Sequence, residues 1–507
     1  MNKKIKILKN NGILGTALYL MSFLAIVVIV KMTFGDDIWY DEVFSVEFIS
    51  KSYKDIVTLT AMDVHPPLYY FYLKTVVGAG GFIFPTVSAI VFAKLASVIP
   101  WIVIAILALT TVRKKYGMTV SGMFLALTTI MPQLATYYVE IRMYSFAMML
   151  IFIAFLAYVE IVENCDNSSA WIVFAIFGVL TAYTQYYACI GIIGLYILLF
   201  VYLLINRKAG NVRFWFSVGF SVICYIPWIP KLIEQISAVS TEYWIQPLTL
   251  KSIFGCAKFI YLPSAWGGFV NYFVTGLMLA STLTIIVIFV ISKPGTKRLL
   301  IAFGGFAPIV AIILSGYIFT ILGTPIFVYR YMIPALGTFY FSIAMMWGRG
   351  AKSKKWSALL VIPFALGGYL AMQGFVGEES NKITNNPVTF DAIANIPNES
   401  VIITNFDHVT TLMDYYKTDS DIYIYDSEVA NLVEKMFERE NPSVGDDEVS
   451  KLVRGNKPVY FLGSFNSRDD ILNSWKKMGI EGREEASVLL ERYWFNIYRL
   501  TGENEEN

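Results

Sequence analysis

Acidic side chains gather in one short segment near the start of this 507-residue chain. Seven of the 13 acids in the first 377 residues lie there: Asp36, Asp37, Asp41, Glu42, Glu47, Asp55 and Asp63. Asp41 and Glu42 lie among aromatic side chains, in the run Trp39-Tyr40-Asp41-Glu42-Val43-Phe44. A carboxylate in a partly desolvated place can have a raised pKa, which suits a general base that takes a proton from a hydroxyl. The alternative interpretation is that the acids only solvate an exposed loop.

A second polar group follows at the end of this segment, in Asp63-Val64-His65-Pro66-Pro67-Leu68-Tyr69-Tyr70. Pro66 restricts His65 to an extended backbone, and Pro67 suits the first turn of a helix. Asp63 and His65 are therefore candidates for part of an acceptor or phosphate pocket. The alternative is a stiff helix start with a hydrogen-bonded histidine. Between the two groups, residues 44–59 predict one short amphipathic helix that lies on the bilayer surface.

The composition indicates that membrane helices position these residues. Hydrophobic residues make up 56% of the chain and charged residues only 15%, against about 25% charged residues in soluble domains. This excludes an ordinary soluble enzyme and a disordered chain. The charge is also divided, because residues 1–377 carry 27 basic and 13 acidic side chains, whereas residues 378–507 carry 13 basic and 25 acidic ones. We expect a membrane domain over 1–377 and an extracytoplasmic domain over 378–507.

A helix that crosses a bilayer needs about 20 apolar residues, and the sequence predicts about eleven such helices. They cover residues 12–31, 87–111, 117–134, 143–162, 170–187, 189–205, 212–230, 268–291, 298–319, 329–347 and 356–374. With the N-terminus in the cytoplasm, the inner segments hold 17 of the 27 basic residues of the membrane part, as the positive-inside rule requires. The rule predicts a multi-pass plasma-membrane protein with residues 32–86 and the C-terminal domain outside the cytoplasm.

The acidic C-terminal part reads as a small α/β domain, because strands and helices alternate along it. The expected strands are 400–405, 421–425, 458–463 and 493–500, and the expected helices are 407–416, 445–454 and 467–479. We expect His408 to be structural or exposed. No run of Lys and Arg is large enough to predict a nucleic-acid partner.

The first outer segment resembles the first periplasmic loop of GT-C glycosyltransferases. It is most similar to glycosyltransferase family 39, the bacterial relatives of protein O-mannosyltransferases, akin to aminoarabinose transferases. The similarity rests on Tyr40-Asp41-Glu42, followed about twenty residues later by the Asp63–Tyr70 run. Other stretches agree with the family: Met131-Pro132-Gln133, Glu140-Ile141-Arg142-Met143-Tyr144, Tyr225-Ile226-Pro227-Trp228-Ile229-Pro230 and Arg330-Tyr331-Met332-Ile333-Pro334. Gln185 is a departure, since relatives often carry His there.

The resemblance implies transfer of a sugar from a polyprenyl-phosphate donor, which is a membrane lipid, to a hydroxyl outside the cytoplasm. The acceptor is a cell-envelope glycan, lipid or protein. In this reading Asp41 inherits the role of general base, and Glu42 is the alternative base or a supporting partner. The fold implied is a polytopic GT-C membrane domain with a small C-terminal α/β domain.

A phosphate leaving group requires cations on the outer side. Arg142 follows Glu140 in a cluster with Tyr138, and Arg330 lies between two tyrosines. The two arginines are candidates for binding the donor phosphate, whereas Glu140 and Tyr138 are candidates for binding the substrate. Arg suits bidentate contact with phosphate, and anchoring at the membrane interface is the alternative for both. Lys94 lies inside an apolar stretch, where a charge is costly and marks a functional site unless it snorkels outward.

Two further assignments stay open in the sequence. Tyr243 and Trp244 are candidates for stacking on sugar faces, with interfacial anchoring as the alternative. The carboxylates of Asp36, Asp37, Asp41 and Asp63 suit a hard divalent cation, but their spacing is not diagnostic. The functions that compete with a glycosyltransferase are a transporter or flippase of lipid-linked sugars and a non-catalytic membrane scaffold.

Overall fold

The computed structural model describes residues 2–35, 37–239, 245–264, 268–351, 355–490 and 493–502. It divides into two compact units. The first contains Met1–Phe34, Val64–Val87 and Val91–Val376, and the second contains Gly35–Asp63, Ser88–Ile90 and Gly377–Asn507. The acidic segment thus belongs to the same unit as the C-terminal residues. The two-domain boundary at 377/378 stays a prediction.

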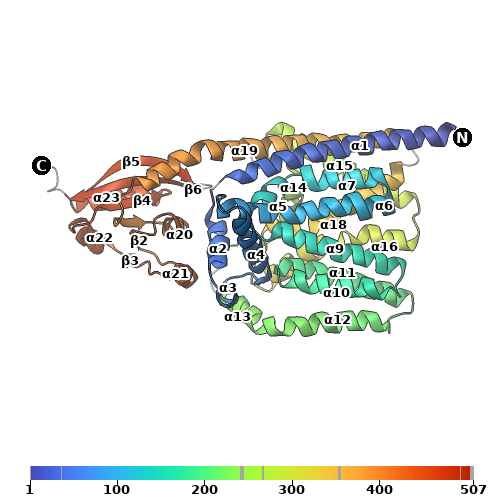
Figure 1. The fold of residues 1–507 in the computed structure, drawn as a ribbon, viewed down its shortest axis with the longest axis horizontal. Helices are drawn as coiled ribbons and strands as arrows, with labels where there is room; N and C mark the ends of the chain where they lie inside the picture. The colour runs from blue at the N-terminus through green and yellow to red at the C-terminus, as the bar shows by residue number, and fades with distance from the viewer. Residues whose placement is uncertain are drawn as a thin grey trace. The chain divides into compact units, whose positions relative to one another are not determined.

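The first unit is a bundle of helices (Figure 1). The helices are α1 (Asn2–Lys31), α4 (Leu68–Ile83), α5 (Ala89–Leu107), α6 (Arg113–Tyr116), α7 (Met118–Ile130), α8 (Leu134–Val139), α9 (Tyr144–Glu163), α10 (Ser168–Ala182), α11 (Tyr186–Ile205), α12 (Val212–Tyr225), α13 (Ile229–Val239), α14 (Ser252–Tyr261), α15 (Phe269–Ile291), α16 (Thr296–Gly304), α17 (Ala307–Ile321), α18 (Ile333–Ala351) and the first part of α19 (Ile362–Ala394). Short turns complete it: η1 (Met32–Phe34), η2 (Ala108–Val112), η3 (Ile226–Trp228), η4 (Tyr329–Met332) and η5 (Lys355–Val361).

Seven helices in the described part of the chain are long and apolar enough to cross a membrane, or eight if the bent pair α16 and α17 forms one span. These helices confirm the predicted polytopic α-helical membrane fold. The number eleven stays a prediction, because several of the expected spans form short helices. Helix α7 has 13 residues and α10 has 15, which is less than the length that a perpendicular span requires.

Helix α9 forms the centre of this bundle. It is apolar and buried along most of its length, and it packs against α10, α11 and α18. Small residues allow close approach elsewhere, as is usual between membrane helices. A Cβ atom added at Gly194 of α11 would lie 2.9 Å from the Cβ of Ala311 in α17. Close backbone packing of this kind holds the helix ends that carry the candidate site in fixed positions.

The C-terminal part of the second unit is a six-stranded sheet with strand order β3-β2-β1-β4-β6-β5. The strands are β1 (Val401–Thr404), β2 (Asp421–Tyr425), β3 (Ser443–Val444), β4 (Val459–Ser464), β5 (Ile480–Leu490) and β6 (Tyr493–Gly502). Strands β1 to β4 pair in parallel, whereas β6 pairs antiparallel with both β4 and β5. The helices are α20 (Asp407–Tyr416), α21 (Asn431–Phe437), α22 (Asp446–Val453) and α23 (Ser467–Lys477). The four expected strands and three expected helices are confirmed.

The predicted amphipathic helix over 44–59 is wrong as a single element. The segment forms two helices, α2 (Tyr40–Ser50) and α3 (Tyr53–Met62). Lys51 is extended, and the Ser52 hydroxyl caps α3 by accepting the Asp55 N–H at 3.2 Å. A serine that accepts a backbone N–H at a helix start is a strong initiation signal, and it outweighs the continuous apolar periodicity.

A buried carboxyl group makes the stability of the second unit depend on pH. Asp414 of α20 is 1% exposed and accepts hydrogen bonds from Asn441 at 3.1 Å and Arg439 at 3.4 Å. Burial raises the pKa of Asp414 from 3.8 to about 6, against the opposing effect of Asn441 and Arg439. Because the folded state prefers the neutral acid, this preference favours folding at low pH and is lost as pH rises through about 6.

We therefore expect the free energy of unfolding of this unit to fall by about 2 kcal/mol between pH 4 and pH 7. Asp414→Asn should remove most of this pH dependence, because the amide does not ionise. Pulse proteolysis of the full-length chain in urea, at both pH values, measures it. Asp421→Asn changes an exposed acid of the same sheet that pairs with Lys457, and it should keep the wild-type pH dependence. An unchanged dependence in Asp414→Asn would contradict the assignment.

Candidate active site

Asp41 and Glu42 lie in the first turn of α2, but they are held differently. Glu42 is buried, and its Oε2 accepts the backbone N–H of Trp39 at 3.1 Å. This is the acidic half of a capping box, which satisfies a donor at the start of the helix. Asp41 is partly exposed beside it. The geometry therefore gives Glu42 a positioning role and leaves Asp41 the better candidate base.

Aromatic rings and acids surround this turn. Tyr40 packs edge-on against Phe44 with ring centroids 5.0 Å apart. Burial raises the pKa of the Tyr40 hydroxyl well above its usual value, and the charges of Asp407, Asp41 and Asp63 raise it further. Asp63 ends α3, where its N–H donates to the Leu59 carbonyl at 3.0 Å. Asp41, Glu42 and Asp63 thus share one unit, and they form a region of negative potential around a neutral phenol.

The turn between α8 and α9 carries Glu140 and Arg142, both about 5% exposed. The Arg142 N–H donates to the Glu140 carbonyl at 2.7 Å, which makes the turn tight. Before it, Gln133 has a positive φ of 70°, a strained backbone for a residue other than Gly. Tyr138 is fully buried, stacks on Trp101 and donates its hydroxyl to the Thr128 carbonyl. These are the contacts of a packing residue, and its substrate role stays a prediction.

Helices α4, α5 and α9 contact one another near this turn. Tyr72 of α4 stacks on Phe146 of α9 at 4.4 Å and donates its hydroxyl to the Ala96 carbonyl of α5. Ser145 of α9 donates to the Ser97 carbonyl of α5 at 2.6 Å. Lys94 is one turn before Ser97 and is 4% exposed. The elements that carry His65, Lys94 and Arg142 are therefore fastened to one another.

Helix α14 connects this region to Arg330. Tyr137 of α8 packs against Phe259 with centroids 6.4 Å apart. One helical turn earlier, a Cβ at Gly255 would overlap the Tyr329 hydroxyl. The position of the Tyr329 ring therefore requires a glycine at residue 255. Phe259 and Gly255 are four residues apart and share one face of the helix. The turns of Arg142 and Arg330 thus lie against the same face of α14.

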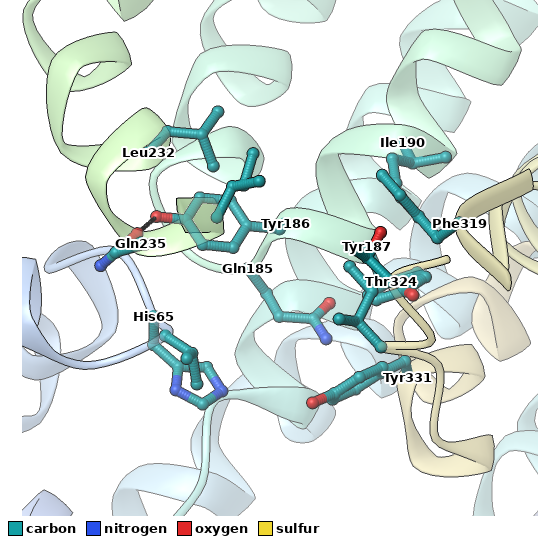
Figure 2. A pocket seen from close by; sticks show the side chains of 13 residues that line it. His65, Gln185, Tyr186, Tyr187, Ile190, Leu232, Gln235, Phe319, Thr324 and Tyr331 are labelled. Atoms are coloured by element: carbon teal, nitrogen blue, oxygen red, sulfur yellow. Dashed lines mark hydrogen bonds between the residues drawn. The ribbon is translucent and has the colours of Figure 1, made fainter. Parts of the chain in front are cut away.

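A cavity in the first unit contains His65 (Figure 2). Its walls are mostly apolar, and its polar groups come from the start of α4, the start of α11, α13 and η4. It is lined by Val64, His65, Gln185, Tyr186, Tyr187, Ile190, Leu232, Gln235, Ile236, Phe319, Thr324, Ile326 and Tyr331. An apolar pocket with a few convergent polar groups is the usual form of a small-molecule site.

Hydrogen bonds fix the cavity walls. The Leu68 N–H donates to the Tyr183 carbonyl at 3.0 Å, which ties the start of α4 to the turn before α11. Gln185 caps α11 by accepting the Ala188 N–H. The Tyr186 hydroxyl donates to Gln235 and accepts the Trp228 indole N–H at 2.9 Å. Tyr187 stacks on Tyr331 with centroids 4.7 Å apart. His65 is thus held in a rigid pocket.

The predicted residues fall into both units. Asp41, Glu42 and Asp63 belong to the second, whereas Lys94, Glu140, Arg142, Arg330 and His65 belong to the first. Tyr243 and Trp244 lie outside the described residues, as does Asp36. Within the described ranges, no three His, Cys, Asp or Glu side chains are grouped closely enough to hold a metal ion.

The sequence did not single out Tyr187 and Gln235 as site residues. Tyr187 has a signal, because it ends the polar and aromatic run Tyr183-Thr184-Gln185-Tyr186-Tyr187 between two apolar stretches. Gln235 has none. It is one polar residue on α13, and only the folded chain brings it to Tyr186.

The fold of this chain, with its helices and its C-terminal sheet, recurs among solved structures. Two crystal structures of ArnT from Cupriavidus metallidurans share it. The apo structure matches 96% of this chain and 98% of its own, with 12% identity and a TM-score of 0.58. The structure bound to undecaprenyl phosphate matches 96% and 97%, with 13% identity and a TM-score of 0.59. No family model matches the sequence, and no curated protein matches it.

The two acids of α2 are distinguished by their expected responses to substitution. Glu42→Gln keeps an acceptor for the Trp39 N–H, so α2 should stay ordered. Glu42→Ala removes the cap, which costs about 1 kcal/mol and should speed amide exchange in residues 39–45 about fivefold. Hydrogen exchange of the full-length chain measures this. Glu47→Gln on the same helix is the control and should change nothing. Equal exchange in Glu42→Gln and Glu42→Ala would contradict the capping role.

Proposed function

We propose that this protein is an integral-membrane glycosyltransferase that moves a sugar from a polyprenyl-phosphate donor to a hydroxyl acceptor on the extracytoplasmic face. The observation that carries the proposal is the likeness to ArnT over almost the whole of both chains. One of the two ArnT structures is bound to undecaprenyl phosphate. The acid pair at the start of α2 and the tethered cationic turns supply the chemistry that such a reaction needs. The N-terminus lies in the cytoplasm and the C-terminal sheet outside, as the distribution of basic residues indicates.

The donor phosphate is the group for which the buried cations are suited. Lys94 and Arg142 are about 95% buried in the first unit, and such charges persist in a membrane protein only where they serve a partner or a substrate. Arg142 and Arg330 supply planar guanidinium groups that match phosphate oxygens. They hold the phosphate as its negative charge grows during departure. The apolar cavity walls beside His65 suit the non-polar parts of the donor.

Asp41 supplies the base. Its carboxylate takes the proton of the acceptor hydroxyl as that oxygen attacks the anomeric carbon of the donor sugar. The new glycosidic bond forms as the bond from the anomeric carbon to the phosphate oxygen breaks. The bonding pair leaves with the polyprenyl phosphate, and the proton stays on Asp41 until solvent removes it. Glu42 keeps the turn in shape through its bond to the Trp39 N–H.

Asp41→Asn should abolish transfer, with a loss of at least about a hundredfold, because an amide does not accept the proton. The variant is expressed in a strain that lacks the gene, and the glycans of its cell envelope are measured by mass spectrometry. Glu47→Gln, a carboxylate change two turns along the same helix, is the matched control and should restore the wild-type glycans. Both variants must reach the membrane in equal amounts. Normal transfer by Asp41→Asn would show that Asp41 is not the base.

Arg142→Ala should weaken binding of the phosphate product. Loss of a charge-assisted hydrogen bond predicts a rise of about ten- to a hundredfold in the inhibition constant of free undecaprenyl phosphate. The comparison is made on purified enzyme with the donor concentration held fixed. Arg213→Ala is the control, because Arg213 pairs with Asp166 in an inner loop. An unchanged inhibition constant in Arg142→Ala would remove this residue from the phosphate site.

A further inference from the structure

We propose that the C-terminal domain is part of the catalytic machinery, and that His408 of α20 is a positioning residue for the turn that carries Asp41. The effect on catalysis rests on the proposed function. The ordering of α2 by α20 does not depend on it. The proposal gives the C-terminal sheet a role in catalysis that its sequence alone does not indicate.

The central contact is a stack of two rings. The imidazole of His408 lies on the phenol of Tyr40 with ring centroids 3.6 Å apart and planes inclined by 14°. Tyr40 is the residue directly before Asp41. His408 Nδ1 also shares a hydrogen bond of 2.5 Å with the Tyr493 hydroxyl, and the Phe406 ring lies 4.6 Å from the imidazole. A ring held by β6 and by the start of α20 therefore fixes the first residue of α2.

Further contacts connect the same domain to the rest of the acidic segment. Lys51, just after α2, forms an ion pair of 2.6 Å with Glu438. Lys435 of α21 lies 3.7 Å from the sulfur of Met62 at the end of α3. Tyr416, at the end of α20, lies beside the Ile38 backbone. The domain thus contacts residues before α2, at its start and beyond its end.

Helix α2 needs this support because it is short. It has 11 residues, and isolated helices below about 12–15 residues are marginal in water. A general base acts only within hydrogen-bond reach of the proton that it removes, and a displacement of about 1 Å costs much of the rate. Glu42 stabilises the first turn of α2 by accepting the Trp39 N–H, and His408 of α20 stabilises the same turn by stacking on Tyr40.

The electrostatics of the contact agree with this role. Burial lowers the pKa of His408, while Asp407 and Asp41 act in the opposite direction. The groups that face the imidazole are Tyr40, Tyr493, Asp407 and Asp41, and burial keeps the phenol of Tyr40 neutral at ordinary pH. A neutral imidazole adds no positive charge beside Asp41 and so does not reduce the basicity of that carboxylate. Protonation of His408 would add that charge, which predicts loss of activity on the acid side.

The test compares two substitutions of His408 in the full-length chain. His408→Phe keeps a ring on Tyr40, whereas His408→Ala removes it. We expect His408→Ala to speed amide exchange in residues 40–45 and to lower kcat, each by about three- to tenfold, with KM for the donor unchanged. His408→Phe should restore both values to near the wild type, and its kcat should lose the acid-side dependence on protonation of the histidine. Trp494→Ala, which removes an exposed aromatic of the same sheet, is the control.

A double-mutant cycle locates the effect in the ring contact. If His408 acts through Tyr40, the pair Tyr40→Ala and His408→Ala together should slow the reaction no more than the stronger single change. Wild-type exchange and kcat in His408→Ala would overturn the proposal. So would an equal loss in His408→Phe and His408→Ala. If the wild-type enzyme transfers no sugar, the proposed function fails, and the exchange rates alone still decide whether α20 orders α2.

Discussion

The hydrocarbon core of a membrane accepts charge only at high cost, and this constraint orders the whole chain. It confines most basic residues of the first 377 positions to segments that we assign to the cytoplasmic side. It leaves the acids of that part concentrated in residues 36–63, where seven of 13 occur. Against this background a buried Lys94 and a buried Arg142 are exceptions. A charge buried within the membrane is by default a functional-site hypothesis, and we propose that these two residues bind the donor phosphate.

The second constraint is geometric. The acids are on a helix of 11 residues that belongs to the unit of the C-terminal sheet, while the cations are fixed within the helix bundle. Each set is rigid for its own reason. Arg142 and Arg330 belong to turns that pack against α14, and Lys94 lies within α5. Asp41 and Glu42 lie in the capped first turn of α2, where His408 stacks on Tyr40. The proposed transfer of a lipid-borne sugar to a hydroxyl uses both sets, so it gives the C-terminal sheet a proposed role in catalysis.

Much of the fold was predictable from the sequence, because long apolar stretches and regular alternation of strands and helices are strong signals. The strands β1, β2, β4 and β6 fall where expected. Strand β5 was missed because its sequence, with Glu481, Arg483, Glu484 and Glu485, is that of a charged edge strand without an apolar pattern. The break between α2 and α3 was missed because the apolar pattern continues on both sides of Ser52. The capping role of this serine is seen only in the structure.

The candidate site was predictable only in part. The acid pair and His65 were found from local sequence, because carboxylates among aromatics and a His-Pro-Pro run are unusual in themselves. The contacts of His408 with Tyr40, of Tyr186 with Gln235 and of Tyr187 with Tyr331 join residues far apart in the chain. No single sequence contains a signal for such pairs, since each partner alone resembles an ordinary polar or aromatic residue.

The central claim is that the chain transfers a sugar to the cell envelope, and one comparison tests it most directly. The gene is deleted, and the cell-envelope glycans, lipids and glycoproteins of the deletion strain and its parent are compared by mass spectrometry. The account predicts that one sugar modification disappears, while its polyprenyl-phosphate donor accumulates. Identical envelope profiles and unchanged donor levels in the two strains would contradict it.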